Sequence, residues 1–121
     1  MPGTGTVLIV EDDDDLRDNL ALLLELRGHQ VETAQNGRQA LSKIGKLGPP
    51  SLIILDLMMP VMNGWQLRAA LLQDPDLATV PVVLLSGVAD VNEAARSLAA
   101  VDHLKKPIDL DKLYRVVDAY A

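Results

Sequence analysis

Five short apolar runs, separated by segments long enough for helices, constrain the fold of this chain more than any other feature of its sequence. Three of the runs are unbroken rather than alternating, which is typical of strands buried on both faces of a parallel sheet. Because strand and helix alternate along the chain, we expect right-handed helical crossovers and helices on both faces of the sheet. The runs are residues 7–10, 31–34, 52–55, 82–85 and the weaker 101–104.

The segments between the apolar runs carry helix signals. Leu16, Leu20, Leu23 and Leu24 form one stripe of a helix that stops near Gly28, a residue type that commonly ends helices. Further helices are expected to open at Asn36-Gly37, to run from about Trp65 to Gln73, to occupy the alanine-rich stretch Asp90–Ala100, and to begin after the N-cap residue Asp109. The side chains expected to face the core from the second and last helices are Ala40, Leu41, Ile44, Leu47, Leu110, Leu113, Tyr114 and Val117.

The composition narrows the class of protein. The chain has 121 residues, and we expect a flexible, linker-like tail at residues 1–6 followed by one domain over residues 7–121. A net charge of −6 and only three aromatic residues disfavour direct contact with nucleic acid, which calls for positive charge or for rings that stack on bases. Because there is no cysteine, disulfide scaffolds, thiolate nucleophiles and cysteine-ligated metals are excluded.

The sequence also bears on where the protein works. No apolar stretch approaches the ~18 residues of a membrane-spanning helix. The first residues have neither the positive region nor the apolar region of a signal peptide. We therefore expect a cytoplasmic protein that makes no contact with a membrane.

Polar residues follow four of the five expected strands at the point where each strand ends. In an open parallel sheet, ligand sites form beyond the carboxyl ends of the strands, so these residues are expected to converge on one edge. This convergence is more informative than any one of the residues. They are Glu11, Asp12 and the acidic residues 13–15 after the first strand, Asp56 after the third, Ser86 and Gly87 after the fourth, and Lys105 and Lys106 after the fifth.

Each of these residues also has a structural interpretation. Acidic residues at a helix start are favoured by the helix dipole by about 0.3–1 kcal/mol, which accounts for residues 13–15. The dipole accounts less well for Glu11 and Asp12, and it does not explain Asp56, because an aspartate after four aliphatic residues is costly to bury without a partner. Taken alone, Asp56 is equally compatible with a structural and a functional role. The others are commonplace when taken alone: a turn hydroxyl at Ser86, a surface cation at Lys106, and surface histidines at His29 and His103.

Taken together, the motifs resemble the receiver domains of two-component response regulators. Val7–Asp12 resembles the family's first strand and acidic pair, and Leu52–Pro60 followed by Val61–Gly64 resembles its phospho-acceptor segment. Leu84–Gly87 and Lys106-Pro107 complete the pattern, so the resemblance covers nearly the whole chain. It implies a flavodoxin-like, doubly wound (βα)5 fold of the α/β class, with a five-stranded parallel sheet in the order 2-1-3-4-5.

The resemblance implies a role for each polar residue. Asp56 would be the phospho-acceptor, a nucleophile that takes a phosphoryl group to form an acyl phosphate. Asp12, Asp56 and the backbone carbonyl of Met58 would coordinate Mg²⁺, with support from Glu11. The peptide bond before Pro107 is usually cis in this family. The contacts implied for the bound phosphate are an ion pair with Lys106 and a hydrogen bond from Ser86.

The same resemblance implies a phosphorylation-dependent switch. The modification adds roughly −1.5 to −2 charges and three acceptor oxygens, towards which Ser86 and the loop after it would move. That movement would bias the packing of the fourth helix, the fifth strand and the fifth helix. The implied partners are a histidine kinase or a phosphotransfer protein as donor, and a downstream protein or output domain as receiver of the signal. The domain would be a monomer or a weak phosphorylation-dependent dimer, and not an ordinary enzyme.

Several features depart from the family's pattern. His103 stands where tyrosine or phenylalanine is common, and Gly87 stands where alanine is common. The stretch Ser86–Lys106 is slightly short, which predicts a shortened fourth helix and altered transmission of the signal. The resemblance also implies that the residues two beyond the phospho-acceptor and two beyond the hydroxyl residue flank the path of the attacking water. Here these are Met58 and Val88, and because both are apolar they predict slow loss of the phosphate.

Three other functions fit parts of the pattern. A phosphatase of the haloacid-dehalogenase type also uses an aspartate nucleophile and Mg²⁺, but it needs a second aspartate two positions on, where Met58 stands. A calcium-binding EF-hand would need an acid or asparagine at the fifth position counted from Asp12, where Leu16 stands. A pseudo-receiver, which is an interaction module with an inactive site, is disfavoured by the presence of Asp12, Asp56, Ser86 and Lys106.

Overall fold

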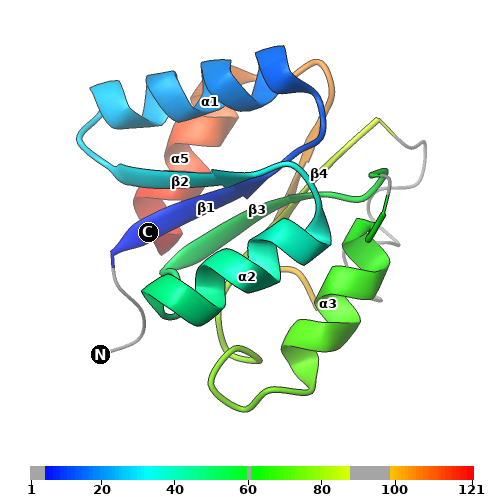
Figure 1. The fold of residues 1–121 in the computed structure, drawn as a ribbon. Helices are drawn as coiled ribbons and strands as arrows, with labels where there is room; N and C mark the ends of the chain where they lie inside the picture. The colour runs from blue at the N-terminus through cyan, green and yellow to red at the C-terminus, as the bar shows by residue number, and fades with distance from the viewer. Residues whose placement is uncertain (1–4, 60, 88–98) are drawn as a thin grey trace.

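A parallel sheet of five strands forms the centre of the protein, and helices lie on both of its faces (Figure 1). The computed structural model describes residues 5–59, 61–87 and 99–121. The strands are β1 (Thr6–Val10), β2 (Gln30–Ala34), β3 (Leu52–Asp56), β4 (Val82–Ser86) and β5 (Asp102–Lys105). The helices of the described residues are α1 (Asp14–Leu26), α2 (Gly37–Leu47), α3 (Gly64–Leu72) and α5 (Leu110–Tyr120).

The strands are ordered β2-β1-β3-β4-β5, and every adjacent pair is parallel. This confirms the predicted doubly wound α/β fold and its strand order. After β1 the chain crosses to the edge strand β2, and it then returns past β1 to form β3. The carboxyl ends of β1 and β3 therefore flank the point where the strand order reverses, which is where open α/β sheets form their sites.

The core consists of two aliphatic layers, one on each face of the sheet. The strands β3 and β4 are buried along their whole length, and β1 is buried after its first residue, as the unbroken apolar runs predicted. Helices α1 and α5 cover one face, and α2 and α3 cover the other (Figure 1). The helical residues buried in these layers include Leu20, Leu24, Leu113, Val116 and Val117 on the first face, and Ala40, Ile44, Leu67 and Leu71 on the second.

Polar N-cap side chains set where the helices begin. Asn36 accepts a hydrogen bond from the N–H of Gln39 at 2.9 Å, and Asn63 forms a reciprocal capping box with Gln66. Asp109 accepts hydrogen bonds from the N–H groups at the start of α5, as its place in the sequence predicted. Such a cap contributes about 1 kcal/mol to helix stability. The caps therefore fix the residues at which α2, α3 and α5 begin.

Two expected core contacts are wrong. Leu47 is 56% exposed and Leu110 is 43% exposed. Leu47 is the last residue of α2 and Leu110 is the first of α5, so no further turn of the helix continues over either side chain. The buried face of α5 is completed instead by Val116, three residues after Leu113.

The fifth strand spans Asp102–Lys105, one residue later at each end than the expected run 101–104, and Val101 is 41% exposed while Leu104 is buried. The expected helix at residues 90–100 lies outside the described residues, except for its last two positions. Residues 1–4 of the expected tail also lie outside them, and Thr6 is already part of β1. Of the helices that the structure describes, none is long and apolar enough to cross a membrane.

Candidate functional site

Asp56 ends β3 at the carboxyl edge of the sheet. Its side chain is buried, with 1% exposed, and Oδ1 accepts a hydrogen bond from the main-chain N–H of Met58 at 3.1 Å. Behind it lies the backbone of Gly64, so close that a Cβ at this position would stand 2.6 Å from the carbonyl oxygen of Asp56. The turn from β3 into α3 therefore requires glycine at position 64.

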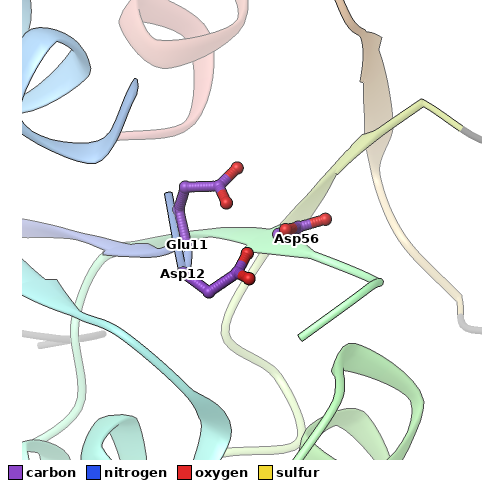
Figure 2. A group of neighbouring side chains, drawn as sticks. All are labelled: Glu11, Asp12 and Asp56. Carbon is purple, nitrogen blue, oxygen red and sulfur yellow. The ribbon is translucent and has the colours of Figure 1, made fainter. Parts of the chain in front are cut away.

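Glu11 and Asp12 directly follow β1. The N–H of Glu11 donates to the carbonyl oxygen of Ala34 at 3.0 Å, which aligns this segment with the end of β2. The Glu11 side chain is fully buried and its Oε2 accepts a hydrogen bond from the N–H of Asp13 at 3.0 Å, whereas Asp12 is exposed. The carboxylates of Glu11, Asp12 and Asp56 offer oxygen atoms that lie within 4.8 Å of one another (Figure 2).

Lys106 reaches the carboxylates from the residues that follow β5. Its Nζ lies 2.9 Å from Oε1 of Glu11 and 3.5 Å from Oδ2 of Asp56. The main-chain N–H of Lys106 donates to the carbonyl oxygen of Ser86 at 3.0 Å, so the chain stays paired with the end of β4. The peptide bond Lys106-Pro107 is cis, as the resemblance implied.

Ser86 is the last residue of β4, and it is fully buried. In the register of β3 and β4, Asp56 stands opposite Leu85, one residue before Ser86. On the other side, Ser86 stands opposite Lys105. The structure therefore brings all the polar positions predicted from the strand ends to one edge of the sheet.

The charges of the cluster do not balance. Burial, together with the neighbouring Glu11, raises the pKa of Asp56 from 3.8 to about 7, although the Met58 N–H and Lys106 act in the opposite direction. Burial on its own lowers the pKa of Lys106, but its close contact with Glu11 and the charges of Asp56 and Glu11 outweigh burial and raise that pKa. Lys106 therefore remains a cation, and among the described residues it is the one cation at ion-pair distance from the carboxylates of Glu11 and Asp56.

The cluster fits a divalent cation. Oε1 of Glu11 and Oδ2 of Asp56 are buried, and neither accepts a hydrogen bond of regular geometry, although both lie at ion-pair distance from Lys106. Two like charges 4 Å apart repel by about 4 kcal/mol at an effective dielectric of 20, and oxygen ligands are those that Mg²⁺ prefers. Within the described ranges, this is the one group of three metal-type ligands.

One residue that contacts the acidic segment was not singled out in the sequence. Arg17 donates from Nη1 to the carbonyl oxygen of Glu11 at 3.1 Å, and its Nη2 lies 2.6 Å from Oδ1 of Asp14. A basic residue in the first turn of the helix that follows the acidic run is the signal that could have indicated it. The histidines lie elsewhere: His29 pairs with Asp118 at 3.3 Å, and His103 lies within β5.

The model of the response regulator receiver domain family matches residues 7–118 of the chain. Because this match covers almost the whole chain, the protein belongs to the response regulator receiver domain family. Its curated relatives include the regulatory protein AtoC of Escherichia coli, which is 33% identical over 97% of this chain, and PilH of Pseudomonas aeruginosa, which is 29% identical over 93% of it. The chain spans 25% of the length of AtoC and 94% of the length of PilH.

Solved structures of receiver domains have the same fold. The receiver domain of a signal transduction histidine kinase from Syntrophus aciditrophicus is 38% identical with a TM-score of 0.83, and the match covers 96% of this chain and 89% of that one. The response regulator TrrA from Thermotoga maritima is 27% identical with a TM-score of 0.83, covering 96% of this chain and 98% of its own. That protein was solved in complex with Mg(2+)-BeF. These neighbours confirm the family that the motifs predicted.

Proposed function

We propose that Asp56 accepts a phosphoryl group from a histidine kinase or a phosphotransfer protein, with Mg²⁺ bound, and that the phosphorylated domain acts on a downstream protein or output domain. The observation that carries this proposal is the placement of Asp56. It is a buried carboxylate at the carboxyl end of β3, with Glu11 and Asp12 within 4.8 Å and Nζ of Lys106 at 3.5 Å. Receiver domains are phospho-acceptor modules rather than ordinary enzymes, so the reaction modifies the protein itself.

The reaction is a substitution at phosphorus. A carboxylate oxygen of Asp56 forms a bond to the phosphorus atom while the bond from phosphorus to the donor breaks, and the electron pair of that bond leaves with the donor. The product is an acyl phosphate on Asp56. Only the ionised carboxylate can attack, and Lys106 favours that form because its charge opposes the rise in the pKa of Asp56.

The ligands for Mg²⁺ would be the carboxylates of Asp12 and Asp56 and the backbone carbonyl of Met58. When bound, Mg²⁺ neutralises negative charge on the carboxylates and on the phosphoryl group. Glu11 would support this site, because its Oε2 is fixed by the N–H of Asp13 and its Oε1 is paired with Lys106. Asp12 is exposed, so the ion can reach the site from solvent.

Lys106 and Ser86 would hold the phosphate after transfer. Lys106 offers a point charge beside Asp56, and Ser86 offers a hydroxyl donor from the end of the neighbouring strand. Their main chains are joined by the hydrogen bond from Lys106 N–H to Ser86, which links the site to β5 and α5. We propose that this side of the domain, with His103 on β5 in place of a tyrosine or phenylalanine, is recognised by the downstream partner. Residues 88–98, which include Val88, lie outside the described part of the chain.

The wider setting follows from the same proposal. We place the domain in the cytoplasm, as a monomer or a weak phosphorylation-dependent dimer, with no direct contact with nucleic acid or a membrane. The net charge of −6 supports the absence of nucleic-acid contacts, because phosphate neutralisation needs the opposite sign.

Incubation with Mg²⁺ and acetyl phosphate, a small phosphodonor, followed by measurement of the intact mass, tests the proposed function. We expect the mass of one phosphoryl group to be added in Mg²⁺ and none in excess EDTA. A pseudo-receiver would gain no mass under either condition, which would contradict the proposal. Equal labelling with and without the divalent cation would contradict the metal site.

A further inference from the structure

The start of α2 contacts the loop that follows Asp56 and restrains it. Gly37, the first residue of α2, donates its N–H to the carbonyl oxygen of Met62 at 3.0 Å. The side chain of Met62 also lies directly against it, because a Cβ at position 37 would stand 2.6 Å from Cγ, 2.9 Å from Sδ and 3.0 Å from Cβ of Met62. Gly37 is buried, so this contact lies inside the molecule. Only glycine leaves room for it.

The same loop is pinned at its other end. The N–H of Gly64 donates to the carbonyl oxygen of Leu57 at 3.1 Å, which closes the turn into α3. Met59 is 8% exposed and packs in the core layer under α2 and α3. The loop therefore has anchors on both sides of Val61, and one of them is supplied by a different helix.

The backbone between these anchors is strained. Val61 has a φ of +68°, in the left-handed region that a β-branched residue rarely adopts, and its side chain is 69% exposed. Backbone of this kind persists only where the surrounding structure imposes it. Since the exposed Val61 side chain makes little contact of its own, the anchors at Met59 and Met62 are what impose the shape of the loop.

We propose that Gly37 and Met62 are positioning residues for the metal and phosphoryl site, an inference that rests on the proposed function. The loop they hold carries Met58, whose N–H orients the Asp56 carboxylate at 3.1 Å and whose carbonyl would bind Mg²⁺. Neither Gly37 nor Met62 is a proposed ligand, so both act through Met58. Residues that orient metal ligands commonly change metal affinity by roughly 10- to 100-fold when they are altered.

Replacing Gly37 by alanine tests whether the contact between Gly37 and Met62 positions the loop. The new methyl group meets the inner atoms of Met62 rather than the free end of its side chain, so the displacement passes to the Met62 backbone and the loop. We expect the affinity for Mg²⁺ to fall roughly tenfold. Affinity can be followed by the fluorescence of Trp65, in the first turn of α3, or by calorimetry with MgCl₂ alone.

Gly45→Ala is the matched control. Gly45 lies further along the same helix, and a Cβ there meets nothing within 4 Å. The chemical change and its effect on helix propensity are similar in the two variants, but only Gly37→Ala reaches Met62. We expect Gly45→Ala to bind Mg²⁺ within about twofold of the parent, because it disturbs no ligand. A parent-like affinity in Gly37→Ala, or an equal loss in Gly45→Ala, would overturn the inference.

The double variant Gly37→Ala/Met62→Ala separates positioning from general damage to the fold. It removes Cγ and Sδ of Met62, the atoms at 2.6 and 2.9 Å, and leaves only Cβ at 3.0 Å. We therefore expect Gly37→Ala to weaken Mg²⁺ binding in the Met62→Ala background by less than about threefold. This comparison holds even if Gly37→Ala alone does not fold. If adding Gly37→Ala to Met62→Ala still weakens binding roughly tenfold, the two residues do not act together and the inference is wrong. The proposed function itself is tested separately, by Mg²⁺ titration and phosphate labelling of the parent. A parent that neither binds Mg²⁺ nor accepts phosphate would overturn it.

Discussion

Asp56 combines the reactivity that the proposed function requires with a cost to the stability of the fold. Burial and the neighbouring Glu11 raise its pKa from 3.8 to about 7, so the folded protein binds this proton more tightly than the unfolded chain does. The ionisation of Asp56 therefore destabilises the metal-free fold. This cost is absent below a pH of about 4, grows as the pH rises towards about 7, and is complete above that value.

The first prediction is that Asp56→Asn stabilises the metal-free protein at high pH. The amide carries no charge, so the variant avoids a cost on the order of 2–4 kcal/mol, since one pKa unit corresponds to about 1.4 kcal/mol. The difference in the free energy of unfolding between Asp56→Asn and the parent should narrow as the pH is lowered from about 8 to about 5. Urea denaturation of both proteins in EDTA measures it. A gap of opposite sign, or one that widens at low pH, would contradict the raised pKa.

The second prediction concerns the lifetime of the phosphate. The side chain of Met58 is 64% exposed beside Asp56, and it offers no polar group that could align a water molecule for attack on phosphorus. We expect Met58→Asn to shorten the lifetime of the acyl phosphate by roughly three- to tenfold, because one hydrogen bond to the water lowers the barrier by ~1 kcal/mol. Intact mass followed over time in Mg²⁺ measures the decay. Met58→Leu is the control and should decay like the parent, whereas an asparagine variant that decays no faster would show that water positioning does not set the lifetime.

At the scale of elements, the caps and strands show how far local sequence determines structure. Asp109 caps its helix as predicted, and α2 begins at Asn36-Gly37 as predicted, because an N-cap depends on neighbouring residues alone. The central strands also follow from their apolar runs. Leu47 and Leu110 were wrongly placed in the core, since helical spacing says which side a residue occupies but not whether another layer covers the end of the helix.

The loop between β3 and α3 yields the third prediction. The left-handed backbone at Val61 costs a non-glycine residue about 1–2 kcal/mol, and part of the gain on replacing it by glycine is lost to the greater freedom of the unfolded chain. We expect Val61→Gly to raise the free energy of unfolding by roughly 0.5–1 kcal/mol. Val101→Gly is the matched control: Val101 is also exposed but is not among the residues with positive φ, so that variant should lose stability. If both variants are destabilised, the strain at Val61 is not real.

At the scale of the whole molecule, the topology explains why the site was predictable and where prediction stopped. A parallel sheet brings the ends of β1, β3 and β4 and the residues after β5 to one edge, so the residues of the site could be named from the strand ends and the motifs. The distances between these residues could not be predicted from the sequence. That Lys106 lies nearer to Glu11 than to Asp56, and that Met62 packs on Gly37, depends on contacts between segments far apart in the chain.

The fourth prediction is that Mg²⁺ stabilises the whole domain through the acidic cluster. A ligand that binds only the folded state adds about 2.7 kcal/mol to its stability at 100 times the dissociation constant. As MgCl₂ is increased, the Tm of the parent should therefore rise, and the Tm of Asp12→Ala should stay almost unchanged. Asp15→Ala removes the same charge from an exposed position in the first turn of α1, and it should respond like the parent. Equal losses in the two variants would mean that Mg²⁺ acts through general charge screening.

The proposed function requires the phosphoryl group to be on the side chain of Asp56, and its position in the chain can be determined chemically. After reaction with acetyl phosphate in Mg²⁺, borohydride reduces an aspartyl phosphate to homoserine, which peptide mass spectrometry assigns to one position. We predict homoserine at position 56 in the parent, and neither mass gain nor homoserine in Asp56→Asn. Homoserine at Asp12 or another carboxylate of the parent, or undiminished phosphorylation of Asp56→Asn, would contradict the account.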